Sequence, residues 1–237
     1  MTNPKAKRLF VLAGYRASGK TTALQIAGKN ENFTIFRPES MPDFRLVQKA
    51  NPQLEKSSGF HTYNDFSDLT GLTGRYLGVH YDFTMPLQNY AQHLFKTRAT
   101  KLDLALHTPG TWTSILKEIL DDGSLARCIA NQFSHFERLS SAFEHTEISI
   151  VKTSWETNRG DWITRMERIT GSTLEEQRRF QKHSFNVALF DDDLKLGARL
   201  YAHIHDQWER LLKASGQNYL WISRAGSHYD VRPTKTK

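Results

Sequence analysis

The stretch that decides the fold is Gly14-Tyr-Arg-Ala-Ser-Gly19-Lys20-Thr21. It satisfies the pattern G-x-x-x-x-G-K-[ST] in full. The apolar run at residues 8–13 predicts a buried parallel strand that leads into it, and the run at 21–29 predicts a helix that follows it. The motif therefore stands where its chemistry needs it, between the end of a strand and the start of a helix.

Each fixed residue of this loop has a physical role. Gly14 and Gly19 let the backbone curl tightly enough for successive N–H groups to face a phosphate, and the positive end of the following helix adds to that anion site. We expect Lys20 to bring its charge to the β- and γ-phosphates and the Thr21 hydroxyl to ligate Mg²⁺. The alternative is a glycine-rich turn with an incidental lysine. The residues predicted to bind the nucleotide are Gly14, Arg16, Ala17, Ser18, Gly19, Lys20, Thr21 and Thr22.

The stretch resembles the P-loop nucleoside-triphosphate-binding superfamily, and the short chain with five candidate strands looks like its small-molecule kinase branch. The recognisable motif covers residues 8–29. The resemblance implies an α/β fold of three layers, α/β/α, around a mainly parallel sheet of roughly five strands. It also implies binding of ATP or GTP with Mg²⁺ and transfer of a phosphoryl group to a small-molecule acceptor. A slow nucleotide-hydrolysing regulatory module is a further alternative.

A second resemblance is to sulfotransferases, which are built on the same fold. The run Arg16-Ala-Ser-Gly-Lys-Thr-Thr22 is similar to their donor-binding loop, which typically ends Ser-Gly-Thr-Thr; Lys20 stands where the first Thr would be. The stretch 77–82 is similar to the strand end where some of these enzymes place a catalytic His, here His80, and 201–222 resembles their helix-then-strand ending. This resemblance implies phosphoadenylyl sulfate as donor, a sugar or alcohol as acceptor, and no metal requirement.

The remaining chain alternates apolar runs with amphipathic stretches. Apolar or β-branched runs predict strands at 33–36, 75–83, 147–151 and 218–223, and helical periodicity predicts helices at 111–120, 125–143 and 194–212. Strands separated by long helices indicate right-handed crossovers and a mainly parallel sheet. We expect a single domain over residues 1–237, with lid or cap insertions at 38–74 and 154–193.

Four acidic or basic side chains are candidates for the chemistry near the strand ends. Asp82 follows the strand residues Tyr76–Tyr81, and ligands gather at the carboxyl ends of parallel strands, so we expect it to hold Mg²⁺ or accept the acceptor's proton. His80 is a candidate base. Glu39 and Asp43 are candidates to touch the acceptor. The alternatives are a turn-capping Asp82, a hydrogen-bonded core histidine and surface acids in a loop.

The segment 154–193 is rich in arginine. Guanidinium groups chelate phosphate or sulfate oxygens, so Arg159, Arg165, Arg168, Arg178 and Arg179 are candidates to close over the phosphates. The alternative is a pair of solvated helices. Three acids at 191–193 are expected to cap the final helix. The predicted catalytic set is Lys20, Asp82, His80, Arg159 and Arg165.

Composition agrees with an anion-binding protein. The chain has 237 residues with 32 Lys+Arg against 25 Asp+Glu, a formal net charge of +7. No zinc-finger, basic-zipper or RNA-binding signature is present, so nucleic acid is not an expected partner; a nucleotide and a small-molecule acceptor are. The apolar run 9–13 is far shorter than the ~20 residues of a membrane span. With Cys128 as its one cysteine the chain forms no internal disulfide, so we expect a cytoplasmic protein; the oligomeric state stays open.

Overall fold

Six strands form one sheet in the structure, which is a computed structural model that describes residues 8–20, 22–23, 59–63, 76–99, 109–179, 184–225 and 228–233. Along the sheet their order is β2-β3-β1-β4-β5-β6. The first five run parallel, and β6 pairs antiparallel with β5. The strands are β1 (Arg8–Gly14), β2 (Gly59–Tyr63), β3 (Tyr76–Asp82), β4 (His145–Lys152), β5 (Tyr219–Ala225) and β6 (His228–Pro233).

Strand β1 lies at the centre because its side chains are apolar on both faces. Leu9 and Val11 belong to the hydrophobic core, and the intervening Phe10 and Leu12 are buried as well. Parallel strands are usually covered on both faces, so a continuous apolar run suits this position. Gly14, the last residue of β1, pairs in register with Asp82 of β3 and Val151 of β4. The loop after β1 therefore begins where two neighbouring strands also end.

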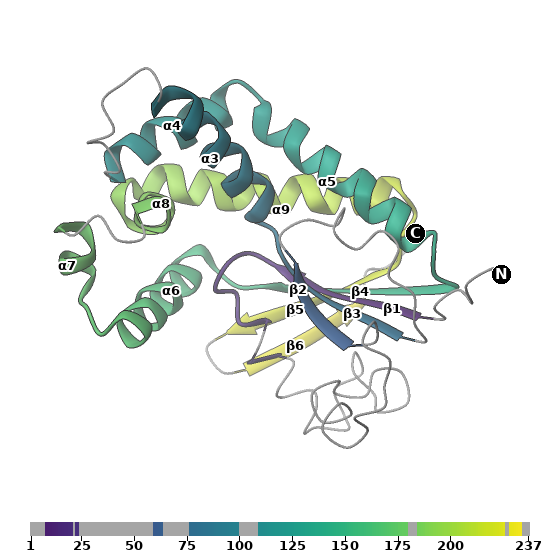
Figure 1. The fold of residues 1–237 in the computed structure, drawn as a ribbon. Helices are drawn as coiled ribbons and strands as arrows, with labels where there is room; N and C mark the ends of the chain where they lie inside the picture. The colour runs from purple at the N-terminus through teal and green to yellow at the C-terminus, as the bar shows by residue number, and fades with distance from the viewer. Residues whose placement is uncertain are drawn as a thin grey trace.

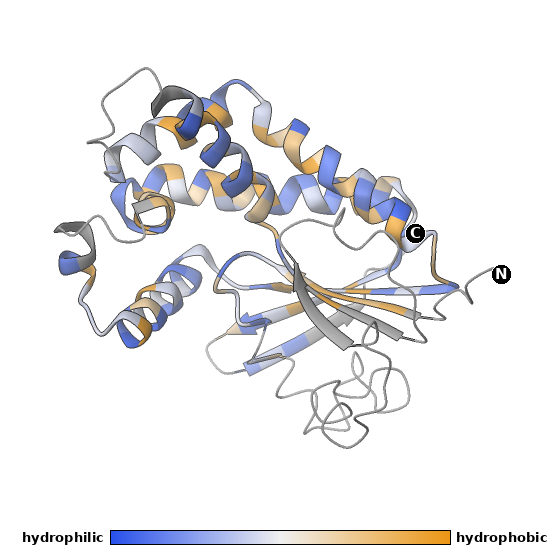
Figure 2. Ribbon diagram, viewed as in Figure 1, coloured by the Kyte–Doolittle hydropathy of each residue, from blue (hydrophilic) through white to orange (hydrophobic). Residues whose placement is uncertain are grey.

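Four helices, α3, α4, α5 and α9, lie over one face of the sheet, whereas α6 and α7 lie beyond the carboxyl ends of the strands (Figure 1). Figure 2 shows apolar residues along β1 and on the helices above it. None of the helices in the described ranges combines the length and apolarity that a membrane crossing needs. The helices are α3 (Met85–Ala99), α4 (Pro109–Asp121), α5 (Ser124–Ser140), α6 (Trp155–Thr170), α7 (Leu174–Arg179), α8 (Ser184–Val187), the π-helical turn η3 (Ala188–Asp192) and α9 (Leu194–Ala214).

Helix α9 shows how the sequence pattern becomes packing. Its apolar side chains recur every four residues and form a buried stripe, made of Leu196, Leu200, Ile204, Trp208 and Leu212. Asp193 caps the helix, because its side chain accepts a hydrogen bond of 3.0 Å from the Leu196 amide. The capping prediction is thus confirmed for Asp193. The other two acids have different partners, since Asp191 pairs with Arg159 and Asp192 accepts a hydrogen bond from Thr113.

Most elements predicted outside the long insertions are confirmed. The strands predicted at 8–13, 75–83, 147–151 and 218–223 are β1, β3, β4 and β5, and the helices predicted at 111–120, 125–143 and 194–212 are α4, α5 and α9. Strands β2 and β6 and helix α3 were not predicted. The strand predicted at 33–36 lies outside the described residues. The chain is therefore an α/β protein with a mainly parallel sheet; the three-layer form and the single-domain organisation stay predictions.

Candidate functional site

The loop after β1 joins strand to helix as its motif predicts. The Ser18 amide donates to the Tyr15 carbonyl at 3.1 Å, and the Ala23 amide donates to the Gly19 carbonyl at 2.8 Å, which closes the first helical turn. Gly19 has a φ of 88°, which favours glycine, and a Cβ on Gly14 would lie only 2.5 Å from the Val151 carbonyl oxygen. Only glycine therefore fits at these two positions. Thr21 lies outside the described residues, so its predicted role as a metal ligand stays a prediction.

Tyr15 anchors the loop in an aromatic cluster. Its side chain is fully buried, and its ring centroid lies 4.9 Å from that of Tyr201 and 6.0 Å from that of Phe190. Burial raises the pKa of the Tyr15 hydroxyl well above its usual value, so the group stays neutral. The phosphate-loop motif leaves this position unspecified, so sequence reasoning gave Tyr15 no role.

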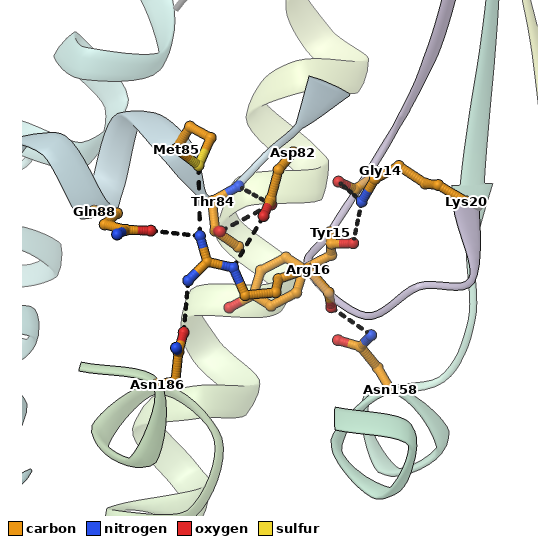
Figure 3. A network of polar contacts seen from close by, with 10 residues as sticks. All are labelled: Gly14, Tyr15, Arg16, Lys20, Asp82, Thr84, Met85, Gln88, Asn158 and Asn186. Atoms are coloured by element: carbon orange, nitrogen blue, oxygen red, sulfur yellow. Dashed lines mark hydrogen bonds and ion pairs between the residues drawn. The ribbon is translucent and has the colours of Figure 1, made fainter. Parts of the chain in front are cut away.

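Lys20 folds back over the start of its own loop. Its Nζ donates to the Gly14 carbonyl at 3.0 Å and to the Tyr15 carbonyl at 2.7 Å, and the side chain is buried (Figure 3). Burial lowers the pKa of the Lys20 amine to about 8, although the Asp82 carboxylate acts in the opposite direction. An anion beside Nζ would favour the charged form.

A pocket of about 560 Å³ is lined in part by Lys20 and lies at the carboxyl ends of β1 and β5. Its volume is within the range of small-ligand sites, and its place agrees with the rule that ligands of open parallel sheets bind beyond the strand ends. Four cationic side chains and one carboxylate are among the described residues that line it. The lining consists of Ala17, Ser18, Gly19, Lys20, Thr22, Asp161, Thr164, Arg165, Arg168, Ile169 and Arg224.

Helix α6 contributes one face to this pocket. Asp161, Arg165 and Arg168 follow one another at intervals of four and three residues, so they share one side of the helix. Arg165 therefore lines the same pocket as the loop, and its predicted contact with a phosphate stays a prediction. Arg224, which lies near the end of β5, was not predicted from the sequence. The rule that ligands gather at the carboxyl ends of parallel strands, which pointed to Asp82, could also have pointed to Arg224.

Arg159 points elsewhere. Arg165 comes six positions after Arg159, and this interval places the two side chains on different sides of α6. Its Nε donates to the Phe190 carbonyl at 2.8 Å, and its guanidinium pairs with Asp191, so it ties α6 to the turn η3. The structure does not bring Arg159 together with the loop. Arg178 and Arg179 belong to α7, but their side chains are outside the described part of the structure.

Arg16 and Asp82 form the second polar cluster at the strand ends. Arg16 Nε lies 2.9 Å from Asp82 Oδ2, and its other nitrogens donate to Gln88 and Asn186 (Figure 3). Asp82 Oδ1 accepts hydrogen bonds from the amide and hydroxyl of Thr84, at 2.9 and 2.8 Å. Although burial opposes it, the nearby Arg16 and Lys20 cations hold the pKa of Asp82 at about 2. Asp82 is therefore ionised at every physiological pH.

The direct partner of Asp82 is thus a cation of its own chain. Both of its oxygens are engaged by Arg16 and Thr84, and in the described ranges no three His, Cys, Asp or Glu side chains are grouped as metal ligands. The described residues do not by themselves form a metal site, and Mg²⁺ commonly depends on substrate phosphates for several of its ligands. The predicted role of Asp82 in binding Mg²⁺ stays a prediction.

The other candidate residues are less fully described. His80 lies in β3 and pairs in register with Leu12, but its side chain is outside the described part of the structure. Glu39 and Asp43 are also outside it. Comparisons with protein-family models, curated proteins and solved structures find no match for this chain. The function is therefore argued from the geometry of the site itself.

The lowered pKa of Lys20 predicts a pH dependence for anion binding. Because a bound phosphate favours the charged amine, binding at pH 8 should take up a proton, and affinity should weaken as the pH rises above about 8. Calorimetric titration with tripolyphosphate in two buffers of different ionisation enthalpy measures this uptake. Lys20→Arg, which stays charged, should abolish it. Equal uptake by both proteins would show that Lys20 is not the titrating group.

Proposed function

We propose that this chain is a nucleotide-dependent transferase that binds ATP or GTP with Mg²⁺ and passes the γ-phosphoryl group to a small-molecule acceptor. One observation carries the proposal. The pocket beside the loop has Lys20 on one side and the cations of α6 and β5 on others: Arg165, Arg168 and Arg224. Such a concentration of positive charge at the carboxyl ends of parallel strands fits a polyphosphate.

The arrangement suits what phosphoryl transfer requires. In that reaction negative charge is spread over the transferred group, and the protein's contribution is mainly positioning and electrostatic stabilisation. The loop would bind the phosphates from one side, and Arg165 and Arg168 would approach from α6. Mg²⁺ bound with the nucleotide would supply further neutralisation of charge.

Asp82 fits the acceptor side of this reaction as an orienting group. It is the last residue of β3, in register with Gly14 at the start of the loop, and its pKa of about 2 keeps it ionised. A carboxylate with so low a pKa accepts a hydrogen bond from an acceptor hydroxyl but is a weak base. We therefore propose that Asp82 positions the acceptor, with Arg16 holding the carboxylate in place.

Sulfuryl transfer from phosphoadenylyl sulfate is the second candidate. It is favoured by the Arg16–Asp82 pair, because an acid already bound to an arginine suits a reaction without a metal. In that case His80 is the proposed base. The donor would occupy the same pocket with its 5′-phosphosulfate.

Thermal unfolding of the full chain with a ligand panel tests these proposals. Mg-ATP or Mg-GTP at a hundred times its Kd should stabilise the protein by about 2.7 kcal/mol, which raises Tm by roughly 5–10 °C for a chain of this size. Adenosine 3′,5′-bisphosphate should give little shift. The reverse result would support sulfuryl transfer. Nucleotide turnover with no acceptor from a metabolite panel would favour a hydrolysing module, and no shift with any of these ligands would refute the site.

A further inference from the structure

Asp161 and Arg224 form an ion pair inside the pocket. Asp161 lies in the second turn of α6 and Arg224 near the end of β5, and Arg224 Nη1 donates to Asp161 Oδ2. Both residues line the pocket, and their side chains are 36% and 13% exposed, respectively. The Asp161 carboxylate therefore accepts a hydrogen bond from Arg224 inside the pocket, in the position that a phosphate oxygen would take on binding to this arginine.

Arg224 is fixed directly against the phosphate loop. A Cβ built on Gly19 would lie 3.0 Å from both Cδ and Nη1 of Arg224, so this side chain crosses the loop in close contact. The Arg224 carbonyl accepts a hydrogen bond of 3.0 Å from the Thr153 hydroxyl, which holds the end of β5 beside β4. Tyr229 of β6 donates to the Gly19 carbonyl at 3.3 Å, so the β5–β6 hairpin contacts the same peptide. The arginine is thus held at the loop before any ligand arrives.

We propose that Arg224 is a polyphosphate ligand whose guanidinium pairs with Asp161, so that an incoming phosphate takes the place of the carboxylate. The inference rests on the proposed function, because it assumes that the pocket beside the loop binds a polyphosphate. Carboxylate and phosphate oxygens engage the same planar guanidinium fork. Asp161 therefore acts as an internal competitor for the anion.

This competition gives the pocket a preference among anions. A ligand must recover, through its contacts with the loop, the free energy lost when the Arg224–Asp161 pair is broken. A di- or triphosphate reaches the loop, Lys20 and Arg224 together, whereas a single tetrahedral anion such as sulfate makes fewer contacts for the same loss. The ligand class that the pair selects is therefore a polyanion with two or more linked phosphates.

A second ion pair on the same helix provides a matched control. Arg159 pairs with Asp191, which anchors α6 to η3 and is not among the lining residues of the pocket. If breaking any ion pair of α6 altered anion binding by loosening the helix, Asp191→Asn would have the same effect as Asp161→Asn. If competition is the cause, only the pair within the pocket should matter.

Calorimetric titration of the full chain with inorganic tripolyphosphate, at pH 7 and fixed ionic strength, tests the inference. Asp161→Asn should tighten binding about three- to tenfold, and Arg224→Gln should weaken it by about tenfold or more. In the Arg224→Gln background, Asp161→Asn should change affinity by less than about twofold, because the Arg224 guanidinium with which Asp161 pairs is then absent. Asp191→Asn should bind like the unaltered protein.

Other outcomes would overturn the inference. Weaker binding by Asp161→Asn would show that Asp161 positions Arg224 for the ligand instead of competing with it. Equal tightening in both backgrounds would indicate a general effect of removing negative charge. Binding by the unaltered protein with no change in Asp161→Asn refutes this inference alone, whereas no binding by the unaltered protein refutes the proposed site as well. Thermal unfolding checks each variant, and Arg224→Lys replaces Arg224→Gln if the latter fails to fold.

Discussion

Replacing Lys20 by alanine is expected to abolish the thermal shift produced by Mg-ATP and to weaken nucleotide binding about a hundredfold. The Lys20 side chain is buried, its amine donates to the first two carbonyls of the loop, and the residue lines the pocket. Charge-assisted hydrogen bonds in such a place contribute about 1.5–3 kcal/mol each, and 2.7 kcal/mol corresponds to a factor of about a hundred. Calorimetric titration and thermal unfolding with and without ligand measure both effects.

The stability of the Lys20→Ala protein distinguishes lost binding from lost folding. Burial disfavours the charged amine, which offsets part of the loss of its two hydrogen bonds to the Gly14 and Tyr15 carbonyls, so Lys20→Ala is expected to destabilise the unliganded protein only modestly. Lys195→Ala is the matched control, because Lys195 is exposed on α9 and does not line the pocket. It should retain the full ligand-induced shift. A normal Mg-ATP shift in Lys20→Ala would mean that the loop is not the phosphate site.

Replacing Asp82 by asparagine is expected to destabilise the protein by about 2 kcal/mol at pH 7. Folding lowers the pKa of Asp82 from its usual value of 3.8 to about 2. Each pKa unit corresponds to about 1.4 kcal/mol of folding free energy, so a shift of roughly two units predicts this loss of stability. Asparagine keeps an oxygen for Thr84 but loses the charge that pairs with Arg16. Chemical denaturation at pH 7 measures the difference.

The pH dependence of this difference identifies its cause. Because the pKa of Asp82 is lower in the folded state, its stabilisation is fully present above about pH 4 and is lost as the pH falls through 3.8 toward 2. The two proteins should therefore converge in stability near pH 2. Asp121→Asn is the control, since its pair with Arg199 is exposed and should contribute less than about 1 kcal/mol. A difference independent of pH would exclude the Arg16–Asp82 pair as its source.

The same substitution should reduce turnover by orders of magnitude while leaving nucleotide binding largely intact. Asp82 is not among the residues that line the pocket beside the loop, so its loss should affect orientation of the acceptor more than affinity for the nucleotide. Steady-state assays at saturating nucleotide, with the acceptor found by screening, measure this effect. Unchanged turnover would remove Asp82 from the catalytic site.

The parts of the site that could be predicted from the sequence are those determined by residues adjacent in the chain. The run before Gly14 is apolar at every position, which specifies a strand buried on both faces, and the glycines at 14 and 19 allow the tight loop. The position of Asp82 at a strand end also followed from the pattern alone. These features depend on backbone conformation and burial over a few residues.

The partners of the charged side chains could not be predicted in the same way. Arg16 forms an ion pair with Asp82, which is 66 positions away in the sequence, and Arg224 forms one with Asp161, which is 63 positions away. No pattern in the neighbouring residues predicts that an arginine at a strand end and an aspartate on a helix will form an ion pair. The β5–β6 hairpin, which holds Arg224 against the loop, was also not predicted.

The sequence by itself determined the strand and the glycine loop, because short-range sterics and hydrophobic burial decide such features. The sequence predicted Arg159 and Arg165 together in the catalytic set, whereas in helix α6 their six-residue interval puts them on different sides. Only the tertiary structure decided which of these arginines reaches the loop and that a carboxylate occupies Arg224. The physical reason is that ion pairs depend on distance in space, and the pairing of β5 with β4 and the position of α6 beyond the strand ends set that distance.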